Sequence, residues 1–327
     1  MNIALLANLF ELPGLPKYIQ QVDQTLQNLP APANPKLREA TNRILNSHGK
    51  RLRPILVIAA AEGCGHQIDQ PVIAAASAIE LIHLASLVHD DIIDASDLRR
   101  GVPTVNGQEG VDTAILVGDY LLAMAGIQAS KAGVDVARVV AEAFAAMCDG
   151  QGLELADNYN VDRSIDSYLD CIDKKTASLL VASVRIGGIC AELPESKLSA
   201  LGRYGEAFGM AFQLADDLND LLSTTEQHGK PTGNDIKEGV YTMPLLLGLQ
   251  GGEADELRGL LRHPITKANS SSIADILKKS GYVDQTIDEI DTYNKQAVTA
   301  LNALEDGNNL AGLAALPNTY KNWALKP

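Results

Sequence analysis

The stretch VIAAASAIELIHLASLVHDDIID, residues 72–94, predicts the fold more strongly than any other part of the chain. Up to Val88 its residues are apolar or small, and only Glu80 and His83 interrupt them. The stretch contains no Gly or Pro and is rich in Ala and Leu. It therefore predicts one long, buried helix.

A cluster of aspartates, Asp90, Asp91 and Asp94, closes this helix. Asp90 and Asp94 are four residues apart, so both project from one helix face, about one turn apart. Like charges at this spacing cost an isolated helix about 0.2–0.5 kcal/mol, and the negative end of the helix dipole adds to the repulsion. We therefore expect a cation here, although a solvated acidic helix end is the ordinary alternative for any single DxxxD pattern.

A second cluster, DDLND at 216–220, follows the mostly apolar run AFGMAFQLA. Asp216 and Asp220 repeat the one-face spacing, and Asp217 lies beside them. Two helices that end in acidic clusters, far apart in the sequence, predict two walls of one cavity that binds a divalent metal. Ligands that offer only oxygen favour Mg²⁺, which binds through carboxylates, water and substrate phosphate.

Composition narrows the class of protein. The chain has 327 residues and a net charge of −14, which argues against nucleic acid and anionic membrane surfaces as partners. Its four cysteines show no CxxC spacing and are expected to be free thiols in a reducing cytosol. The first residues lack the basic region of a signal peptide, and no apolar run approaches the length of a membrane span. We expect a cytoplasmic protein without stable membrane insertion.

Apolar residues recur at three- and four-residue spacing along most of the remaining chain, whereas alternating strand patterns are scarce. The stretches predicted as helices are 15–29, 35–48, 108–130, 132–158, 164–190, 199–222 and 241–250, with shorter helices in 253–327. Because the two acidic clusters must share a cavity, we expect a single all-α domain over 1–327. It should be a bundle of about a dozen helices around a central apolar cavity.

Basic residues accompany both clusters. GKRLRP precedes the long helix, two arginines follow its aspartates, and lysines lie in DKKTASL and after the second cluster. Taken singly each is an ordinary surface charge, but together they predict a site for anionic phosphates. His83 lies about two turns before Asp90 on the same face, where a satisfied core histidine is the alternative. The basic residues are Lys50, Arg51, Arg53, Arg99, Arg100, Lys174, Lys175 and Lys230.

These motifs in this order resemble the trans-isoprenyl diphosphate synthases, or polyprenyl synthetases. The resemblance rests on GKRLRP, HLASLVHDDIIDASDLRRGVPT, FQLADDLND and GKPTGNDI, and it runs from about residue 40 to about 250. GDYLLA at 118–123 and KTASL at 175–179 belong to it. It implies an all-α homodimeric prenyltransferase with three Mg²⁺ ions per active site. The enzyme would condense isopentenyl diphosphate with an allylic diphosphate to give all-trans polyprenyl diphosphates.

The same resemblance implies roles for individual residues. The metal ligands would be Asp90, Asp91, Asp94, Asp216, Asp217 and Asp220. The residues that hold isopentenyl diphosphate would be Lys50, Arg53, His83 and Arg100. The residues on the allylic side would be Arg99, Lys175, Thr176, Gln213 and Lys230. Catalysis would depend most on Asp90, Asp94, Asp216, Lys175 and Lys230.

One position departs from the family pattern. Many members carry lysine where this chain has Val240. The change removes a contact to the allylic diphosphate and leaves Lys175 and Lys230 with more of its charge. It therefore predicts a reduced rate or an altered primer preference.

Product length is predicted from the positions before the first cluster. In the family, bulky aromatics at the fourth and fifth positions before the first aspartate close the product tunnel. Here these positions are Ser86 and Ala85, and further small residues precede them, so we expect products beyond twenty carbons. The alternatives are that the small residues serve helix packing and that the enzyme is a geranylgeranyl or farnesyl diphosphate synthase.

Three other classes compete with this interpretation. A terpene cyclase shares the aspartate-rich helix but would not need GKRLRP for a second diphosphate. The partner subunit of a heteromeric synthase would tolerate loss of a cluster, whereas both are intact here. Glu80 and His83 form an ExxH pattern typical of di-iron bundles, but such a site needs a second ExxH, which the sequence lacks.

Overall fold

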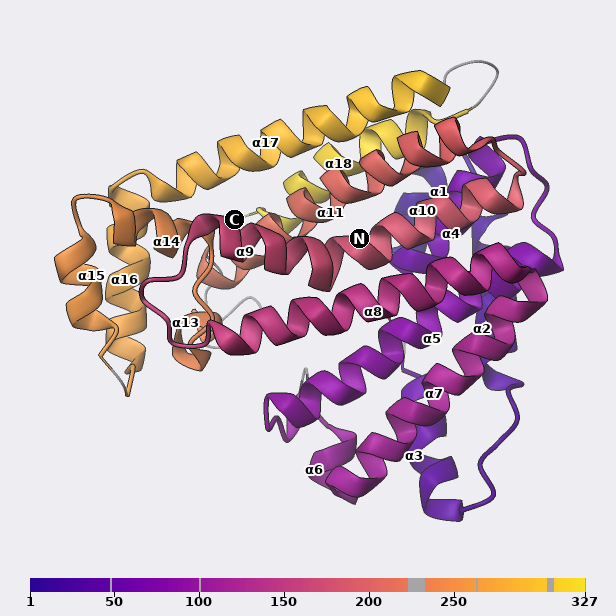
Figure 1. Cartoon of the computed structure of the whole chain (residues 1–327), viewed down its shortest axis with the longest axis horizontal. Helices are drawn as coiled ribbons and strands as arrows, with labels where there is room; N and C mark the ends of the chain where they lie inside the picture. Colours follow the sequence, from indigo (N-terminus) through magenta and orange to yellow (C-terminus); the bar gives the residue numbers. More distant parts are fainter. Residues whose placement is uncertain (48, 100, 223–232, 263, 305–308, 327) are drawn as a thin grey trace. The chain divides into compact units, whose positions relative to one another are not determined.

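The computed structural model describes residues 1–47, 49–99, 101–222, 233–262, 264–304 and 309–326, and these residues are mostly helical (Figure 1). The described strands form one short antiparallel pair, β1 (Leu98–Arg99) and β2 (Val102–Pro103). The all-α prediction is confirmed.

The chain divides into two compact units. Unit 1 comprises Met1–Phe144, Ala182–Gly202 and Ala303–Leu313, and unit 2 comprises Ala145–Val181, Arg203–Asn302 and Ala314–Pro327. The helices wholly in unit 1 are α1 (Ile3–Leu9), α2 (Leu15–Gln27), α3 (Pro35–Leu45), α4 (Leu52–Gly63), α5 (Gln70–Ile93), α6 (Val105–Glu109) and α7 (Val111–Ala132). Those in unit 2 are α9 (Ile165–Ile172), the π-helical turn η1 (Asp173–Ala177), α13 (Asn234–Glu238), α14 (Met243–Gln250), α15 (Ala254–Leu260), α16 (Lys267–Lys279) and α17 (Tyr282–Leu301). The elements with residues in both are α8 (Val134–Ala156), α10 (Ser178–Cys190), α11 (Glu195–Leu222), the 3₁₀ turn η2 (Asn302–Leu304) and α18 (Ala311–Ala324).

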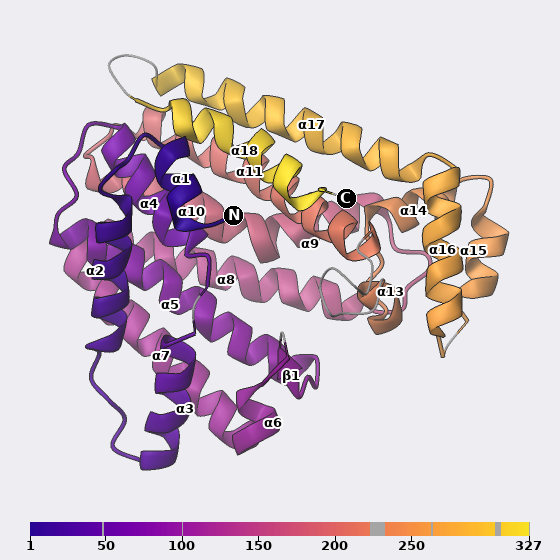
Figure 2. The same ribbon diagram turned by 180° about the vertical axis from the view of Figure 1, so that it is seen from behind.

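Helix α5 is the core of unit 1. It contains the predicted buried stretch and begins where the Asp69 side chain accepts a hydrogen bond of 3.1 Å from the Val72 N–H. It packs along α7 and against α4 and α2, and α3 in turn packs on α7 (Figure 2). A helix that is apolar on every side is stable only when neighbours cover it. This arrangement places the first aspartate cluster at the C-terminal end of a rigid element.

The expectation that no apolar run approaches a membrane span was wrong. By length and composition alone, α5 and α7 qualify as candidate spans. The most apolar window of α5 is 78% buried inside the protein, as expected for the core helix of a globular protein, which passes the same test. The corresponding window of α7 is 44% buried and leaves apolar side chains exposed.

The stretch 164–190, predicted as one helix, is two α-helices joined by a π-helical turn. The Ser178 N–H donates to the carbonyl of Asp173, five residues back. Two glycines permit close approach to this turn. A Cβ on Gly150 of α8 would lie 2.3 Å from the backbone nitrogen of Lys175, and a Cβ on Gly209 of α11 would lie 2.4 Å from the Ala177 Cβ. Backbone contact with neighbouring helices therefore holds the turn.

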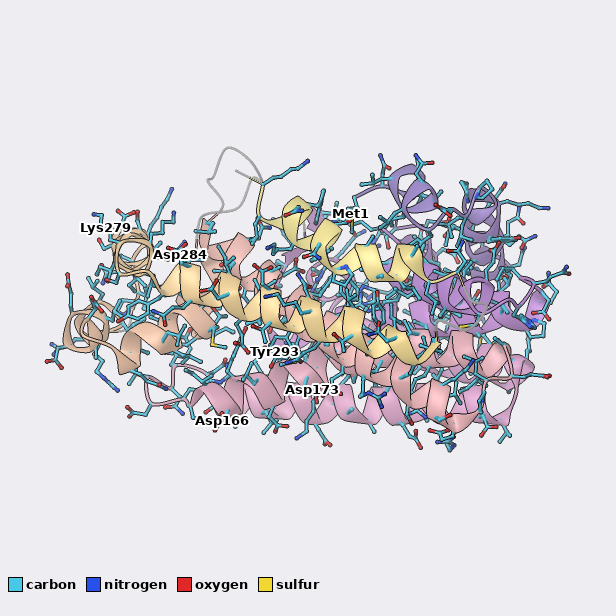
Figure 3. The ribbon with its side chains drawn as sticks, turned by 90° about the horizontal axis from the view of Figure 1, so that it is seen from above. Met1, Asp166, Asp173, Lys279, Asp284 and Tyr293 are labelled. Carbon is cyan, nitrogen blue, oxygen red and sulfur yellow. The ribbon has the colours of Figure 1, made fainter. Side chains whose placement is uncertain are left out.

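Helix α17 corrects the expectation of short helices in the C-terminal stretch, because it has 20 residues. Lys279 ends α16 and Asp284 lies in the first turn of α17 (Figure 3). Each charge is opposite in sign to the nearby end of the helix dipole and therefore stabilises its helix. Gly281 between them takes a φ of 80°, a conformation that glycine adopts without strain. The dipeptide Ser280-Gly281 thus ends one helix and begins the next.

Candidate active site

The first aspartate cluster lies where α5 ends. Asp94 is the C-cap, and its N–H donates to the Asp90 carbonyl at 2.8 Å, so the helical spacing of the two residues persists to the end. Asp90 is half-buried and Asp94 is exposed. Asp91 is buried and accepts a 2.8 Å ion-paired hydrogen bond from Nε of Arg99 on β1. The cluster thus divides into two accessible carboxylates and one that is tied to an arginine.

The loop after the cluster is closed back onto α5. The Thr104 hydroxyl and the Asn106 side-chain amide both donate to the Ser96 carbonyl, at 2.7 and 2.9 Å. Asn106 Nδ2 also lies 3.3 Å from the carbonyl of Asp91. These bonds hold the hairpin that carries Arg99 against the cluster. The predicted ligand Arg100 lies outside the described residues.

The residues predicted to hold isopentenyl diphosphate gather where α4 begins beside the middle of α5. Nη1 of Arg53 lies 3.2 Å from Nε2 of His83, and both side chains are half-buried. Glu80, the other half of the ExxH pattern, binds Nη1 of Arg51 at 2.6 Å. Both residues of the ExxH pattern thus contact an arginine. These contacts explain the pattern without an iron site. The predicted ligand Lys50 is exposed at the start of the same turn.

Glycine in the GDYLLA motif is explained by packing in unit 1. A Cβ on Gly118 of α7 would lie 2.0 Å from Nε2 of His89, the residue before the first cluster. His89 Nε2 lies 3.8 Å from Asp119 of the same motif. Any larger side chain at Gly118 would displace the ring of His89.

In unit 2 the second cluster is held by tyrosines. The Tyr168 hydroxyl donates to Oδ2 of Asp217 and the Tyr320 hydroxyl donates to Oδ1 of Asp216, each at 2.5 Å. Asp220 Oδ2 accepts from the backbone N–H of Asp235 at 3.2 Å. All three aspartates of DDLND therefore have defined orientations on α11.

Two of the residues predicted on the allylic side, Thr176 and Gln213, form a chain of contacts that leads to this cluster. The Thr176 hydroxyl donates to Oε1 of Gln213 at 2.7 Å, and Nε2 of Gln213 donates to Oδ1 of Asp217 at 2.6 Å. Lys175 forms an ion pair with Glu154 of α8. Lys174, its neighbour in the motif, instead pairs with Asp170 near the surface at 2.8 Å. Lys230 lies outside the described residues.

Negative charge accumulates around the second cluster. Burial raises the pKa of Asp217 to about 7, although the hydrogen bonds from Tyr168 and Gln213 favour its charged form. Burial, followed by the charges of Asp220 and Asp217, raises the pKa of Asp235 well above its ordinary value. Neighbouring carboxylates repel one another, and a bound cation relieves this repulsion. The site is therefore suited to a cation.

Sequence reasoning missed four of these residues. Asp235 lies within the quoted motif GKPTGNDI and could have been found there. Glu154 lies in the predicted helix 132–158, to which no site residue was assigned. Tyr168 and Tyr320 are 49 and 104 residues from the aspartates that they contact. Only a three-dimensional structure brings such pairs together.

The residues present fit a hydrated Mg²⁺. Among the residues described, no group of three or more His, Cys, Asp or Glu side chains is arranged to hold a metal ion. Mg²⁺ does not need such a cage, because it keeps several waters and is bound through one or two carboxylates and substrate phosphate. Asp90 and Asp94 at the end of α5, and Asp216 and Asp220 on α11, supply oxygen donors of this kind.

A model of the family described as polyprenyl synthetase matches residues 34–280. The chain belongs to the polyprenyl synthetase family. This confirms the resemblance drawn from the motifs and identifies the protein as a prenyltransferase. The match extends beyond the motif-bearing part, 40–250, on both sides.

Several polyprenyl synthetases are similar over nearly the whole chain. The nonaprenyl diphosphate synthase of Mycobacterium tuberculosis (strain ATCC 25618 / H37Rv) is 36% identical over 303 residues, which cover 91% of this chain and 90% of the relative. The heptaprenyl diphosphate synthase component 2 of Bacillus subtilis (strain 168) is 32% identical, over 91% of this chain and 86% of the relative. The crystal structure of a decaprenyl diphosphate synthase from Rhodobacter capsulatus superposes with a TM-score of 0.88 at 30% identity, covering 99% of both chains.

Ala85 and Ser86, the two positions linked to product length in polyprenyl synthetases, differ from each other in how deeply they are buried. Ala85 is fully buried on α5, whereas Ser86 is half-buried and its hydroxyl donates to the His83 carbonyl at 2.9 Å. Ala75 and Ala76 further back are completely covered. Close helix packing therefore accounts for part of the small-residue run, and Ser86 is the more open of the two predicted positions.

Proposed function

We propose that this polyprenyl synthetase condenses isopentenyl diphosphate with an allylic diphosphate, dependent on Mg²⁺, in the cytoplasm. The observation that carries the proposal is the pair of aspartate-rich helix segments, each linked by hydrogen bonds to other residues of the family motifs. Asp91 contacts Arg99 at the first cluster, and Thr176 is linked through Gln213 to Asp217 at the second.

Metal binding follows from the carboxylates. Asp90, Asp94 and Asp216 would hold the ions most directly, with Asp91, Asp217 and Asp220 assisting. Bound Mg²⁺ supplies charge that stabilises the departing pyrophosphate. Asp91 is oriented by Arg99, and Asp217 by Tyr168 and Gln213, so each would assist from a fixed position.

The basic residues divide between two diphosphates. Arg53, His83, Lys50 and Arg100 would bind isopentenyl diphosphate, and Arg99, Lys175 and Lys230 the allylic substrate. The C–O bond of the allylic diphosphate breaks and pyrophosphate leaves with the electron pair. The double bond of isopentenyl diphosphate then attacks the allylic cation and forms the new C–C bond. The cation that results loses a proton to the released pyrophosphate. Apolar walls exclude the water that would otherwise quench the cation.

Medium-to-long products, beyond twenty carbons, are the second part of the proposal. The small side chains at Ser86 and Ala85 support it, as do relatives named for nonaprenyl, heptaprenyl and decaprenyl products. Similar proteins also include a geranylgeranyl diphosphate synthase from Sulfolobus acidocaldarius, 33% identical, so the product must be measured.

Assembly as a homodimer is the third part. On α7 the apolar side chains of Val111, Ile115, Leu116 and Ile127 are exposed. Such a face is covered when a second copy packs against it. The Bacillus relative is named as one component of a synthase, so assembly with a different chain is the alternative that a mass measurement decides.

Steady-state kinetics with both substrates test the proposal. Purified protein with Mg²⁺, isopentenyl diphosphate and an allylic primer should release pyrophosphate and elongate the primer. Arg53→Ala should raise the KM for isopentenyl diphosphate more than that for the primer, and Lys175→Ala should do the reverse. Equal effects on both substrates would contradict the division of the cations.

A further inference from the structure

Arg51, between the predicted ligands Lys50 and Arg53, has a backbone that is unusual for arginine. It is the N-cap of α4 with φ 52° and ψ 31°, in the left-handed region, and its side chain makes no capping bond. Residues other than glycine rarely adopt this conformation, and they persist in it when the surroundings hold them there. The side chain must therefore supply interactions that glycine cannot.

The guanidinium of Arg51 uses all three of its nitrogens. Nε lies 3.0 Å from Oδ1 of Asp23 on α2, Nη1 lies 2.6 Å from Oε1 of Glu80 on α5, and Nη2 donates to the Ser47 carbonyl at 3.2 Å. The side chains of Arg51 and Glu80 are each 4% exposed. One residue of the GKRLRP turn is thus tied to α2, to α5 and to the segment after α3.

Charge separates Arg51 from its neighbours in the motif. Two carboxylates, Asp23 and Glu80, neutralise its single positive charge, so a diphosphate would meet a group of net negative charge. Each of its three nitrogens also already donates to an acceptor within the protein. Arg51 is therefore not an anion ligand, although it lies between two basic residues, Lys50 and Arg53, that are predicted to be ligands.

The geometry links Arg51 to the predicted ligands. Glu80 and His83 are three residues apart on α5 and so lie on one face. Arg51 binds the first and Arg53 contacts the second, which makes two parallel connections between the same two segments. A shift of Arg51 therefore moves Arg53 and Lys50 as well.

We propose that Arg51 is a positioning residue that, through Glu80 and Asp23, fixes the turn presenting Lys50 and Arg53 to the diphosphate of isopentenyl diphosphate. The inference rests on the proposed function, which assigns Lys50 and Arg53 to that substrate. It assigns the ExxH glutamate the task of holding the arginine.

The test compares Arg51→Gly with wild type, because glycine accepts the left-handed backbone and removes only the side chain. The KM for isopentenyl diphosphate should rise about tenfold or more, since small displacements of positioning groups have effects of this size, while the KM for the allylic primer changes less than about twofold. Arg51→Lys should restore little, because one ammonium cannot reach three acceptors in a planar fork. Arg138→Gln, at an exposed arginine with surface ion pairs, is the matched control and should leave both constants unchanged.

A purely structural role would lower the fraction of active protein, and hence the apparent kcat, and leave both KM values at wild type. That result would overturn the proposal, as would an equal rise of both KM values. Arg53→Ala, measured in parallel, separates two failures. A raised KM for isopentenyl diphosphate in Arg53→Ala with none in Arg51→Gly would refute the role of Arg51 alone. An unchanged value in Arg53→Ala would refute the substrate assignment itself.

Discussion

The hydroxyl of Tyr168 donates a 2.5 Å hydrogen bond to Asp217, and both side chains are buried. The guanidinium of Arg163 lies over the face of the Tyr168 ring, 5.4 Å from its centre. The orientation of a buried carboxylate in the second aspartate cluster thus depends on a tyrosine of α9, 49 residues away.

Tyr168→Phe removes this donor without changing the shape of the ring. Leaving a buried acceptor short of a partner costs about 1–3 kcal/mol, so the free energy of unfolding should fall by that amount. The Mg²⁺ concentration for half-maximal activity should rise as Asp217 loses its orientation. Tyr159→Phe, whose hydroxyl donates to the Lys237 carbonyl at the surface, is the control. An unchanged Mg²⁺ dependence in Tyr168→Phe would refute this role.

Stability of the metal-free protein should depend on pH through the same carboxylate. Burial raises the pKa of Asp217 from 3.8 to about 7, so the folded protein binds this proton more tightly than the unfolded chain. The stability that it contributes is complete below about pH 4 and is lost as the pH rises to about 7. Thermal unfolding in EDTA should therefore show a lower Tm at pH 8 than at pH 5.

Asp217→Asn removes that titration and should flatten the dependence of Tm on pH. The variant should also be more stable than wild type at pH 8, because a neutral amide replaces a buried charge. Asp235, whose pKa is raised in the same direction, keeps part of the slope in the variant. An equal slope in both proteins would show that Asp217 does not titrate in this range.

The accessible aspartates should be required for turnover. Asp90→Ala, Asp94→Ala and Asp216→Ala should each reduce kcat by about a hundredfold or more, because each removes charge that holds the metal beside the leaving group. Pyrophosphate release at saturating Mg²⁺ measures the effect. Asp166→Ala, at an exposed position in the first turn of α9 (Figure 3), should retain wild-type turnover. Near-normal activity in any of the three variants would break the two-cluster proposal.

Product length should respond to position 86. Ser86 is half-buried, so Ser86→Phe can place a ring beyond the surface of α5 and shorten the products while the first condensation continues. Ala85→Phe should also shorten them, but at a fully buried position overpacking costs about 1–3 kcal/mol. Ser272→Phe on the exposed side of α16 is the control. Chromatography of the extracted products decides, and an unchanged length in Ser86→Phe places the end of the tunnel elsewhere.

Mass in solution tests the homodimer. At micromolar concentration light scattering should give twice the chain mass of 34.8 kDa. Leu116→Glu, in the middle of the exposed apolar face of α7, should shift the mass toward that of one chain. Leu5→Glu on α1 places the same charge at another exposed leucine and should leave the dimer intact. A wild-type monomer would refute the proposed assembly.

Helical periodicity was sufficient to predict the fold class. Period and composition located α5 closely, because a long run of apolar residues without glycine or proline has few other ways to be buried. The two aspartate clusters were visible because their i, i+4 spacing is local. Family motifs then named the chemistry, which periodicity alone does not supply.

The contacts that orient the site were not predictable in the same way. Arg51 looked like a third phosphate ligand, and only its two carboxylate neighbours, 28 and 29 residues away, show that its charge is already used. The pairing of Asp91 with Arg99 is closer in sequence, but two arginines follow the cluster and the pattern did not say which one turns back. Such choices depend on packing between distant segments.

The π-helical turn at Asp173–Ala177 has a consequence for the register of the chain after it. A turn with i to i+5 bonding contains one residue more than an α-turn, and one residue corresponds to a rotation of about 100° around the helix. Every side chain from Ser178 onward therefore faces a direction that an uninterrupted helix would have given to a neighbouring position. Deleting Lys174 would therefore restore regular winding and leave Leu179 and Leu180 in their buried places. Regular winding at unchanged length would instead rotate α10 by about 100° and turn both leucines out of the core.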